Sequence, residues 1–174
     1  VWSDMLKAHQ NISPVVPRTG MSLYIHVPFC QTKCPYCDFN TYQGIENLIE
    51  PFLPAITSEI TCWGDALAYP PVKSVFFGGG TPSYLPQGDI ERILVAIQSS
   101  FQVDPASEIS IEANPGDLDE AACAGILNPG VNRLSIGVQS LDNDLLNLLG
   151  RRHQASEAVS AFQSARQAGF DNVN

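Results

Sequence analysis

Two hydrophobic patterns alternate along this chain. Short runs rich in β-branched and aromatic residues predict strands over 22–27, 72–77, 108–113 and 132–138, and a fifth run opens after residue 170. Apolar residues at steps of three and four predict amphipathic helices over 50–63, 89–101, 118–127, 142–149 and 155–168. This alternation predicts βαβ units, and therefore an α/β fold with a parallel sheet.

Prolines and glycines limit two of these helices. Pro51 and Pro54 fit the first helix only within its first turn, where the backbone N–H groups have no intrahelical partner. Gly169 directly follows the last helix and is expected to cap its C-terminus.

The pattern leaves two architectures open, an open doubly wound sheet or part of a (β/α) barrel. In both, ligands bind at the carboxyl ends of the parallel strands. Each unusual motif of this chain directly follows a predicted strand: the cysteines of 30–37, the glycines of 78–80, the turn 114–116 and the pair 139–140. We therefore expect these motifs to meet on one rim of the sheet.

Composition narrows the function classes. The chain has 174 residues, 44% of them hydrophobic, and 9 basic against 18 acidic residues give a formal net charge of −9. That length fits about one domain with a sizeable core, and the acidic balance argues against a general binder of nucleic-acid backbones. No run approaches the ~18 apolar residues of a membrane span, and the first twenty residues lack the apolar block expected of a secretory signal. A cytoplasmic location with reduced thiols is expected.

The two ends of the chain differ from its middle. Residues 1–20 contain Pro14, Pro17 and Gly20 and are expected to form a loose leader, with 21–174 as the folded part. Because the sequence begins with Val1 and stops within a β-type run, we expect it to be a fragment of a longer protein.

Three of the five cysteines give the strongest chemical signal. Cys30, Cys34 and Cys37 have C-x3-C-x2-C spacing, so three thiolates on one loop can hold three corners of a [4Fe–4S] cluster and leave one iron open. A zinc site with His26 or Asp38 as fourth ligand, a C-x-x-C redox pair and chance clustering are the alternatives.

The other motifs are ambiguous on their own. A run such as Gly78-Gly-Gly-Thr-Pro82 is often only a tight turn, although glycines also let a ligand approach the backbone closely. Glu112 ends a strand, where its carboxylate suits ribose hydroxyls, an ammonium group or simple solvation. Gln139 and Arg151 carry no clear signal alone, His153 carries none, and His26 is expected to be a packed core histidine.

Together the motifs carry a resemblance. Tyr24-Ile-His-Val-Pro-Phe-Cys30 and the cysteine loop, Phe76-Phe-Gly-Gly-Gly-Thr-Pro82, Glu112-Ala-Asn-Pro115 and Arg133-Leu-Ser-Ile-Gly-Val-Gln-Ser140 stand in order from about residue 21 to the end. The chain thus resembles radical S-adenosylmethionine (SAM) enzymes, and more narrowly the group of oxygen-independent coproporphyrinogen III oxidase and the heme chaperones. The resemblance implies a partial (β/α) barrel of the radical SAM type, truncated after about four strand–helix units.

The resemblance also implies roles for eleven residues. A [4Fe–4S] cluster with SAM on its open iron would be bound by Cys30, Cys34 and Cys37. Positions that line this SAM are matched by Tyr24, Gly79 and Glu112. Positions that touch a second SAM in the oxidase are matched by Tyr36, Gly80, Thr81, Gln139 and Arg151. In the family, one electron from the reduced cluster cleaves SAM to a 5′-deoxyadenosyl radical.

One position separates the two relatives. The oxidase pattern adds a cysteine two residues after the third, where this chain has Phe39. This form resembles the chaperones, so the resemblance favours a protein that binds heme as cargo and passes it to an acceptor. The alternatives are the oxidase, which decarboxylates porphyrinogen propionates, and, more remotely, a zinc-binding interaction module. The sequence identifies neither an electron donor nor a heme acceptor.

Overall fold

The computed structural model of this chain describes residues 20–174, so most of the predicted leader lies outside the described part. Five strands form one parallel sheet in the order of the chain: β1 (Met21–Val27), β2 (Pro71–Gly79), β3 (Gln102–Ala113), β4 (Arg133–Ile136) and β5 (Asn172–Val173). All five strands predicted from the hydrophobic pattern are present, and the parallel sheet is confirmed.

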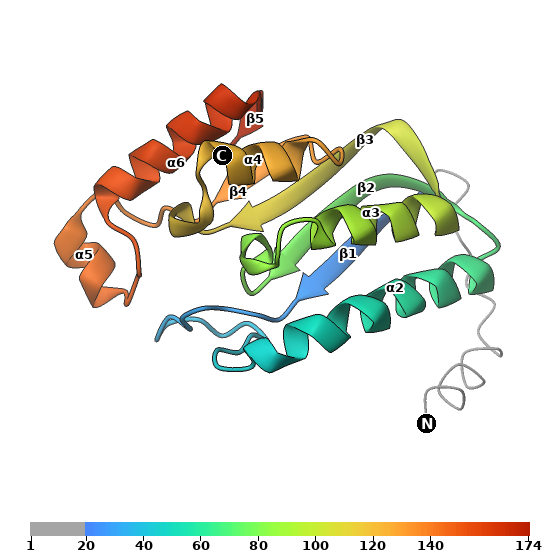
Figure 1. The fold of residues 1–174 in the computed structure, drawn as a ribbon, viewed down its shortest axis with the longest axis horizontal. Coiled ribbons are helices and arrows are strands. Elements are labelled where there is room, and N and C mark those ends of the chain that lie inside the picture. Colours follow the sequence, from blue (N-terminus) through green and yellow to red (C-terminus); the bar gives the residue numbers. More distant parts are fainter. Residues whose placement is uncertain (1–19) are drawn as a thin grey trace.

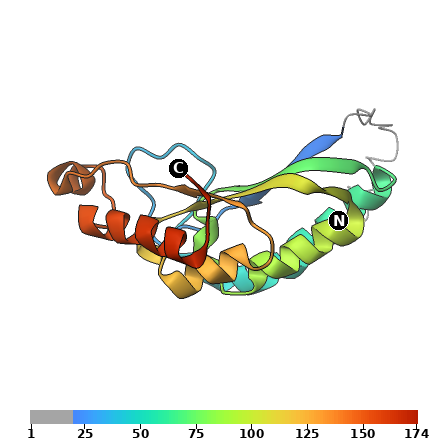
Figure 2. The same ribbon diagram turned by 90° about the horizontal axis from the view of Figure 1, so that it is seen from above.

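Helices make the crossovers between the strands. They are α2 (Ile49–Ala66), α3 (Asp89–Ser100), α4 (Glu120–Leu127), α5 (Asn143–Leu148) and α6 (Ala155–Ala168), with short 3-10 turns η1 (Glu46–Leu48), η2 (Pro82–Tyr84) and η3 (Pro115–Asp117). The helices α2, α3, α4 and α6 cover one face of the sheet, and α5 projects beyond its edge (Figure 1, Figure 2). Helices on one face and strands in sequential order are the arrangement of part of a (β/α) barrel, and they exclude the doubly wound alternative.

Alternate residues of each strand build the core. Val27, Phe77, Ile111 and Leu134 are fully buried between the sheet and the helices. Their neighbours along the strands point to the opposite face, because side chains alternate along a strand. This alternation explains why the strands do not read as continuous apolar runs, as strands covered on both faces do.

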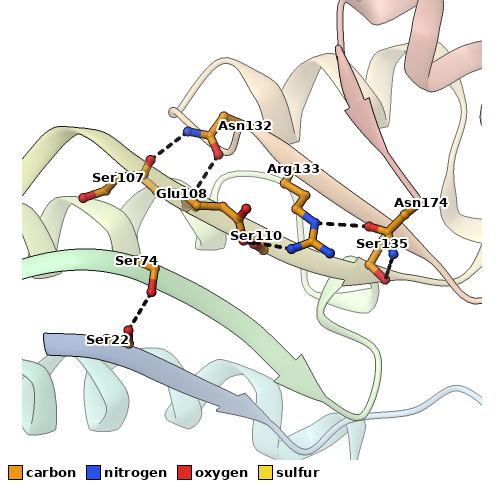
Figure 3. Close-up of polar contacts among 10 residues, drawn as sticks. Ser22, Ser74, Ser107, Glu108, Ser110, Asn132, Arg133, Ser135 and Asn174 are labelled. Carbon is orange, nitrogen blue, oxygen red and sulfur yellow. Dashed lines mark hydrogen bonds and ion pairs between the residues drawn. The ribbon is translucent and has the colours of Figure 1, made fainter.

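The opposite face of the sheet carries hydrogen-bonded polar side chains (Figure 3). The Ser74 hydroxyl donates to Ser22 Oγ at 2.7 Å, linking β2 to β1. The Arg133 Nη1 donates to Glu108 Oε1 at 2.9 Å, which links β4 to β3. Over residues 20–174 no helix covers this face, as expected of the inner wall of a barrel.

The element boundaries differ from the prediction where hydrogen bonds outweigh hydrophobicity. The third strand begins at Gln102, not 108, because its polar first half still pairs with Pro71 and Val72 of β2. The helix α4 begins at Glu120, not 118, because the Asp119 carboxylate caps it by accepting from Ala122 N at 2.7 Å.

Two further expectations concerned Gly169 at the end of the last helix and Pro54 near the start of the first. The expected cap Gly169 has φ +107° at the C-terminus of α6. The expectation that Pro54 lies in the first turn is wrong, because α2 begins at Ile49 and Pro54 therefore lies inside the helix. Within 20–174, no helix combines the length and apolar character that crossing a membrane requires.

Two helical glycines give a matched test of the packing. A Cβ on Gly64 of α2 would overlap the carbonyl oxygen of Ser100 at the end of α3. We therefore expect Gly64→Ala to lower the free energy of unfolding by about 1–3 kcal/mol, although alanine favours helices. A Cβ on Gly125 of α4 would meet only the Gln87 amide at 3.0 Å, which can move. Gly125→Ala should raise stability by up to about 1 kcal/mol. Urea unfolding compares the two, and a stabilising Gly64→Ala would contradict the close contact of α2 and α3.

Candidate functional site

The motifs that follow the strands converge on one cavity, as the sequence predicted. This cavity of about 340 Å³ lies at the carboxyl ends of β1 to β4. Ten of the eleven expected site residues line it: Cys30, Cys34, Tyr36, Cys37, Gly79, Gly80, Thr81, Glu112, Gln139 and Arg151. Tyr24 is not among the lining residues, but it lies close to Gly78 and Glu112 on the inner face of the sheet.

Backbone hydrogen bonds close the cysteine loop at its base. Cys30 N donates to Tyr42 O at 2.9 Å, and Tyr42 N donates to Pro28 O at 2.8 Å. Across the loop, the Lys33 ammonium donates to the carbonyls of Phe39 and Thr41 at 3.1 and 2.9 Å. The cysteines are therefore presented on a closed loop with its own internal bonds.

Each thiol of this loop contacts a different polar group. The Thr81 hydroxyl donates to Cys30 Sγ at 3.6 Å, and Arg151 Nη1 donates to Cys34 Sγ at 3.4 Å. The Cys37 thiol lies 3.9 Å from the Thr41 hydroxyl. Among residues 20–174, no three Cys, His, Asp or Glu side chains are gathered closely enough to hold a single metal ion.

The donor set on this cavity fits a cluster better than a zinc ion. Three thiols on one loop are the ligands of iron–sulfur clusters, which are larger than one ion. His26, one of the two suggested fourth zinc ligands beside Asp38, has both ring nitrogens within hydrogen-bond distance of protein groups: Nδ1 lies 3.0 Å from Tyr24 OH and Nε2 lies 2.8 Å from Asn40 O.

The contacts of His26 assign its tautomer. Because a carbonyl only accepts, Nε2 carries the hydrogen and donates it to Asn40 O. Nδ1 then accepts from the Tyr24 hydroxyl. The expectation of a packed core histidine is wrong, because His26 is only partly buried and joins the cysteine loop to Tyr24. No sequence pattern predicts this link, because the two partners of His26 are a backbone carbonyl and a side chain on the same strand.

The glycine run is required by its contact with β1. Gly80 N donates to Val27 O at 2.7 Å, and Thr81 N donates to Phe29 O at 2.8 Å. A Cβ on Gly80 would lie 2.5 Å from Phe29 O, so no other residue fits there without movement. Gly79 has φ +111°, which also favours glycine. The two readings of this run, tight turn and ligand contact, are thus compatible, because the same backbone lines the cavity.

Glu112 is a half-buried carboxylate beside this run. It accepts a hydrogen bond from Gly79 N at 3.3 Å. Burial raises its pKa above the ordinary carboxyl value, and the Gly79 bond opposes this only in part. Burial, and then the charge of Glu112, raise the pKa of Tyr24. A carboxylate with spare acceptor capacity therefore lies at the cavity wall, where it can bind hydroxyl or ammonium groups.

The pH dependence of stability tests this environment. Because the pKa of folded Glu112 is raised, stability falls as pH rises from the unfolded value to the folded one, and the cost persists above it. Glu112→Gln removes this cost, so at pH 7 the variant should have a higher free energy of unfolding than the unmodified protein. At pH 4 the difference between the two proteins should be smaller.

Glu108 provides the matched control, because its pKa is shifted in the opposite direction to that of Glu112. Hydrogen bonds from Ser110 and Arg133 lower its pKa, so its contribution is present above the ordinary carboxyl pKa and is lost as pH falls through the folded pKa. Glu108→Gln should lower stability at pH 7. Urea unfolding across pH 3–8 measures both variants, and the same sign for the two would contradict the assignment.

Comparisons with known proteins agree with this geometry. The radical SAM superfamily profile matches residues 24–174. The chain is 36% identical over 154 residues to the heme chaperone HemW of Bacillus subtilis, covering 88% of this chain and 41% of that protein. It is 38% identical over 156 residues to the mitochondrial radical S-adenosyl methionine domain-containing protein 1 of Mus musculus, covering 88% and 35%.

A solved structure gives the same fold. Coproporphyrinogen III oxidase (HemN) from Escherichia coli, described as a radical SAM enzyme, superposes with a TM-score of 0.83 at 30% identity, over 99% of this chain and 39% of that one. The predicted partial barrel of the radical SAM type is therefore confirmed. The chain spans about two fifths of the length of these relatives.

Proposed function

Because this chain belongs to the radical SAM superfamily, we propose that its cavity binds a [4Fe–4S] cluster and SAM, and that the whole protein is a heme chaperone. The family implies the cluster and SAM, whereas heme is suggested by relatives named as heme chaperones. The observation that carries the proposal is that three thiols, the glycine run and a half-buried carboxylate line one cavity at the strand ends.

The residues of the cavity divide into two groups by chemistry. Cys30, Cys34 and Cys37 would hold the cluster, since thiolates are its usual ligands. Gly79 and Glu112 would form the SAM side of the cavity, with Tyr24 beside them on the inner face of the sheet. A second binding position would be surrounded by Tyr36, Gly80, Thr81, Gln139 and Arg151. When bound, the cluster and SAM supply one-electron cleavage of the sulfonium C–S bond.

The protein groups have complementary tasks in this site. Gly79 and Gly80 present backbone close to the cavity, and Glu112 offers an acceptor for hydroxyl or ammonium groups. The His26 bond to Asn40 O holds the far end of the cysteine loop against β1. These residues orient the ligands, and the ligands carry the chemistry.

Phe39 supports the chaperone over the oxidase. This side chain is 67% exposed and lies on the cavity lining, two residues after the third cysteine. A phenyl ring provides neither a thiol nor a proton donor there, so the chemistry that an additional cysteine would offer is absent. Three thiols still suffice for a cluster with an open iron. The oxidase, with turnover of coproporphyrinogen III, is the second candidate, and the likeness of the fold to HemN supports it only as a related family.

The cysteines test the cofactor proposal. We expect Cys30→Ala, Cys34→Ala and Cys37→Ala each to abolish the brown absorbance and the iron and sulfide content of the anaerobically reconstituted full-length protein. Cys62→Ala on α2 is the half-buried control, and Cys123→Ala on α4 is the buried one. Burial raises the pKa of the Cys123 thiol to about 11, so this thiol stays protonated. Both controls should retain the cluster. Loss of the cluster in either control would overturn the ligand assignment, and zinc without sulfide would favour the interaction module.

Heme handling is tested with the same full-length protein. We expect anaerobic heme titration to saturate and coproporphyrinogen III, supplied with SAM and reductant, to remain unconverted by chromatography. Phe39→Cys should leave the iron content unchanged, because the position is not needed for the cluster. Sustained formation of protoporphyrinogen by the unmodified protein would make the oxidase the correct function.

A further inference from the structure

The segment between α5 and α6 packs directly against the cysteine loop. Gly150 has φ +65°, and a Cβ there would lie 2.7 Å from Cδ of Pro35, between the second and third cysteines. Arg151 N donates to Leu146 O at 2.9 Å, which fixes the chain as it leaves α5. A glycine at 150 therefore brings the next residue within reach of Cys34.

Three consecutive side chains of this segment bind three different parts of the rim. Arg151 donates from Nη1 to Cys34 Sγ at 3.4 Å and from Nη2 to Gly137 O at 2.8 Å. Arg152 pairs with Asp117 of η3. The ring of His153 is buried, with Nε2 3.1 Å from Val138 O. The segment is thus tied to the ends of β3 and β4 at the same time as it touches the cysteine loop.

The guanidinium of Arg151 is held in place on two sides. Gly137 makes room for it, since a Cβ there would lie 3.3 Å from Nη2. Its Nε is buried and without a hydrogen-bond partner. The guanidinium therefore holds a positive charge beside Cys34.

We propose that Arg151 is a positioning residue that donates a hydrogen bond to the thiolate of Cys34 and thereby raises the reduction potential of the cluster. The proposal rests on the proposed function, because it requires the cluster. It gives Arg151 a task beyond contact with a second SAM, since both Nη groups already have partners on the protein.

The direction of the effect follows from charge. Reduction adds an electron to a cluster that its thiolates already make negative, so a nearby cation and N–H donor stabilise the reduced state more than the oxidised one. The three sulfurs are not equivalent in this respect. Cys30 and Cys37 lie beside the hydroxyls of Thr81 and Thr41, and only Cys34 has a cationic donor within hydrogen-bond distance in the described part of the chain.

The test is a spectroelectrochemical titration of the reconstituted full-length protein, with the reduced cluster followed by electron paramagnetic resonance. At a fixed potential, we expect Arg151→Gln to lower the ratio of reduced to oxidised cluster at least tenfold, which for a one-electron couple is a shift of about 59 mV to lower potential. Arg151→Lys keeps the charge but lacks the planar fork that reaches both partners, so its shift should be smaller.

Arg152→Gln is the matched control. It removes a neighbouring positive charge that pairs with Asp117 and not with a thiol. At the same fixed potential, its ratio of reduced to oxidised cluster should differ from that of the unmodified protein by less than threefold. An unchanged midpoint in Arg151→Gln with full iron and sulfide content would overturn the inference, as would equal shifts in the two variants. If Arg151→Gln loses the cluster, the test is made with Arg151→Lys. An unshifted midpoint potential in Arg151→Lys would then overturn the inference. Absence of a cluster from the unmodified protein would instead refute the proposed function.

Discussion

The arrangement of residues at the carboxyl ends of the strands depends on one close contact between two backbone segments. The glycine run after β2 crosses the end of β1 closely enough for Gly80 N to donate to Val27 O at 2.7 Å. The next bond, from Thr81 N to Phe29 O, brings the Thr81 hydroxyl to Cys30. Any side chain at position 80 would meet the Phe29 carbonyl, so the contact exists only because the residue is glycine. It joins the cysteine loop to the glycine run before any ligand is present.

This backbone contact explains why the site lies where it does. In a parallel sheet all strands end at one rim, so residues more than a hundred positions apart, such as Cys34 and Arg151, meet there. The helices on one face anchor the strands by buried apolar residues, while the other face stays polar and hydrogen-bonded (Figure 2, Figure 3). The rim can therefore vary in chemistry without disturbing the core, which is the general property of barrel folds.

Much of the fold could be predicted because its signals are local. The alternation of strand-type and helix-type runs gave all five described strands, and Gly169 marked the end of α6. The start of β3 could not be predicted, since Gln102 pairs with Pro71 through the backbone, and backbone pairing leaves no hydrophobic signal. The start of α4 at Glu120 depended on whether Asp119 or a nearby residue would act as the cap, which the pattern alone does not decide.

The features of the site can likewise be divided into those that the sequence predicts and those that it does not. The three cysteines can be identified from their spacing, and the convergence of the motifs follows from the topology of parallel strands. The contacts of His26 and His153 could not be predicted, because each binds a backbone carbonyl, Asn40 O and Val138 O, that is set by the tertiary fold. Burial lowers the pKa of His153, so this histidine serves packing in its neutral form.

The charge distribution around the cysteine loop completes this account. The chain has twice as many acidic as basic residues, 18 against 9, so its average field disfavours additional thiolates. Two of the few cations are nevertheless committed to the loop: Lys33 donates to two of its carbonyls, and Arg151 donates to Cys34. Arg151 is half-buried, so its charge is screened less by salt than that of an exposed side chain such as Lys33. The local positive field offsets the acidic surroundings where negative sulfur is to be stabilised, which the net charge alone would not indicate.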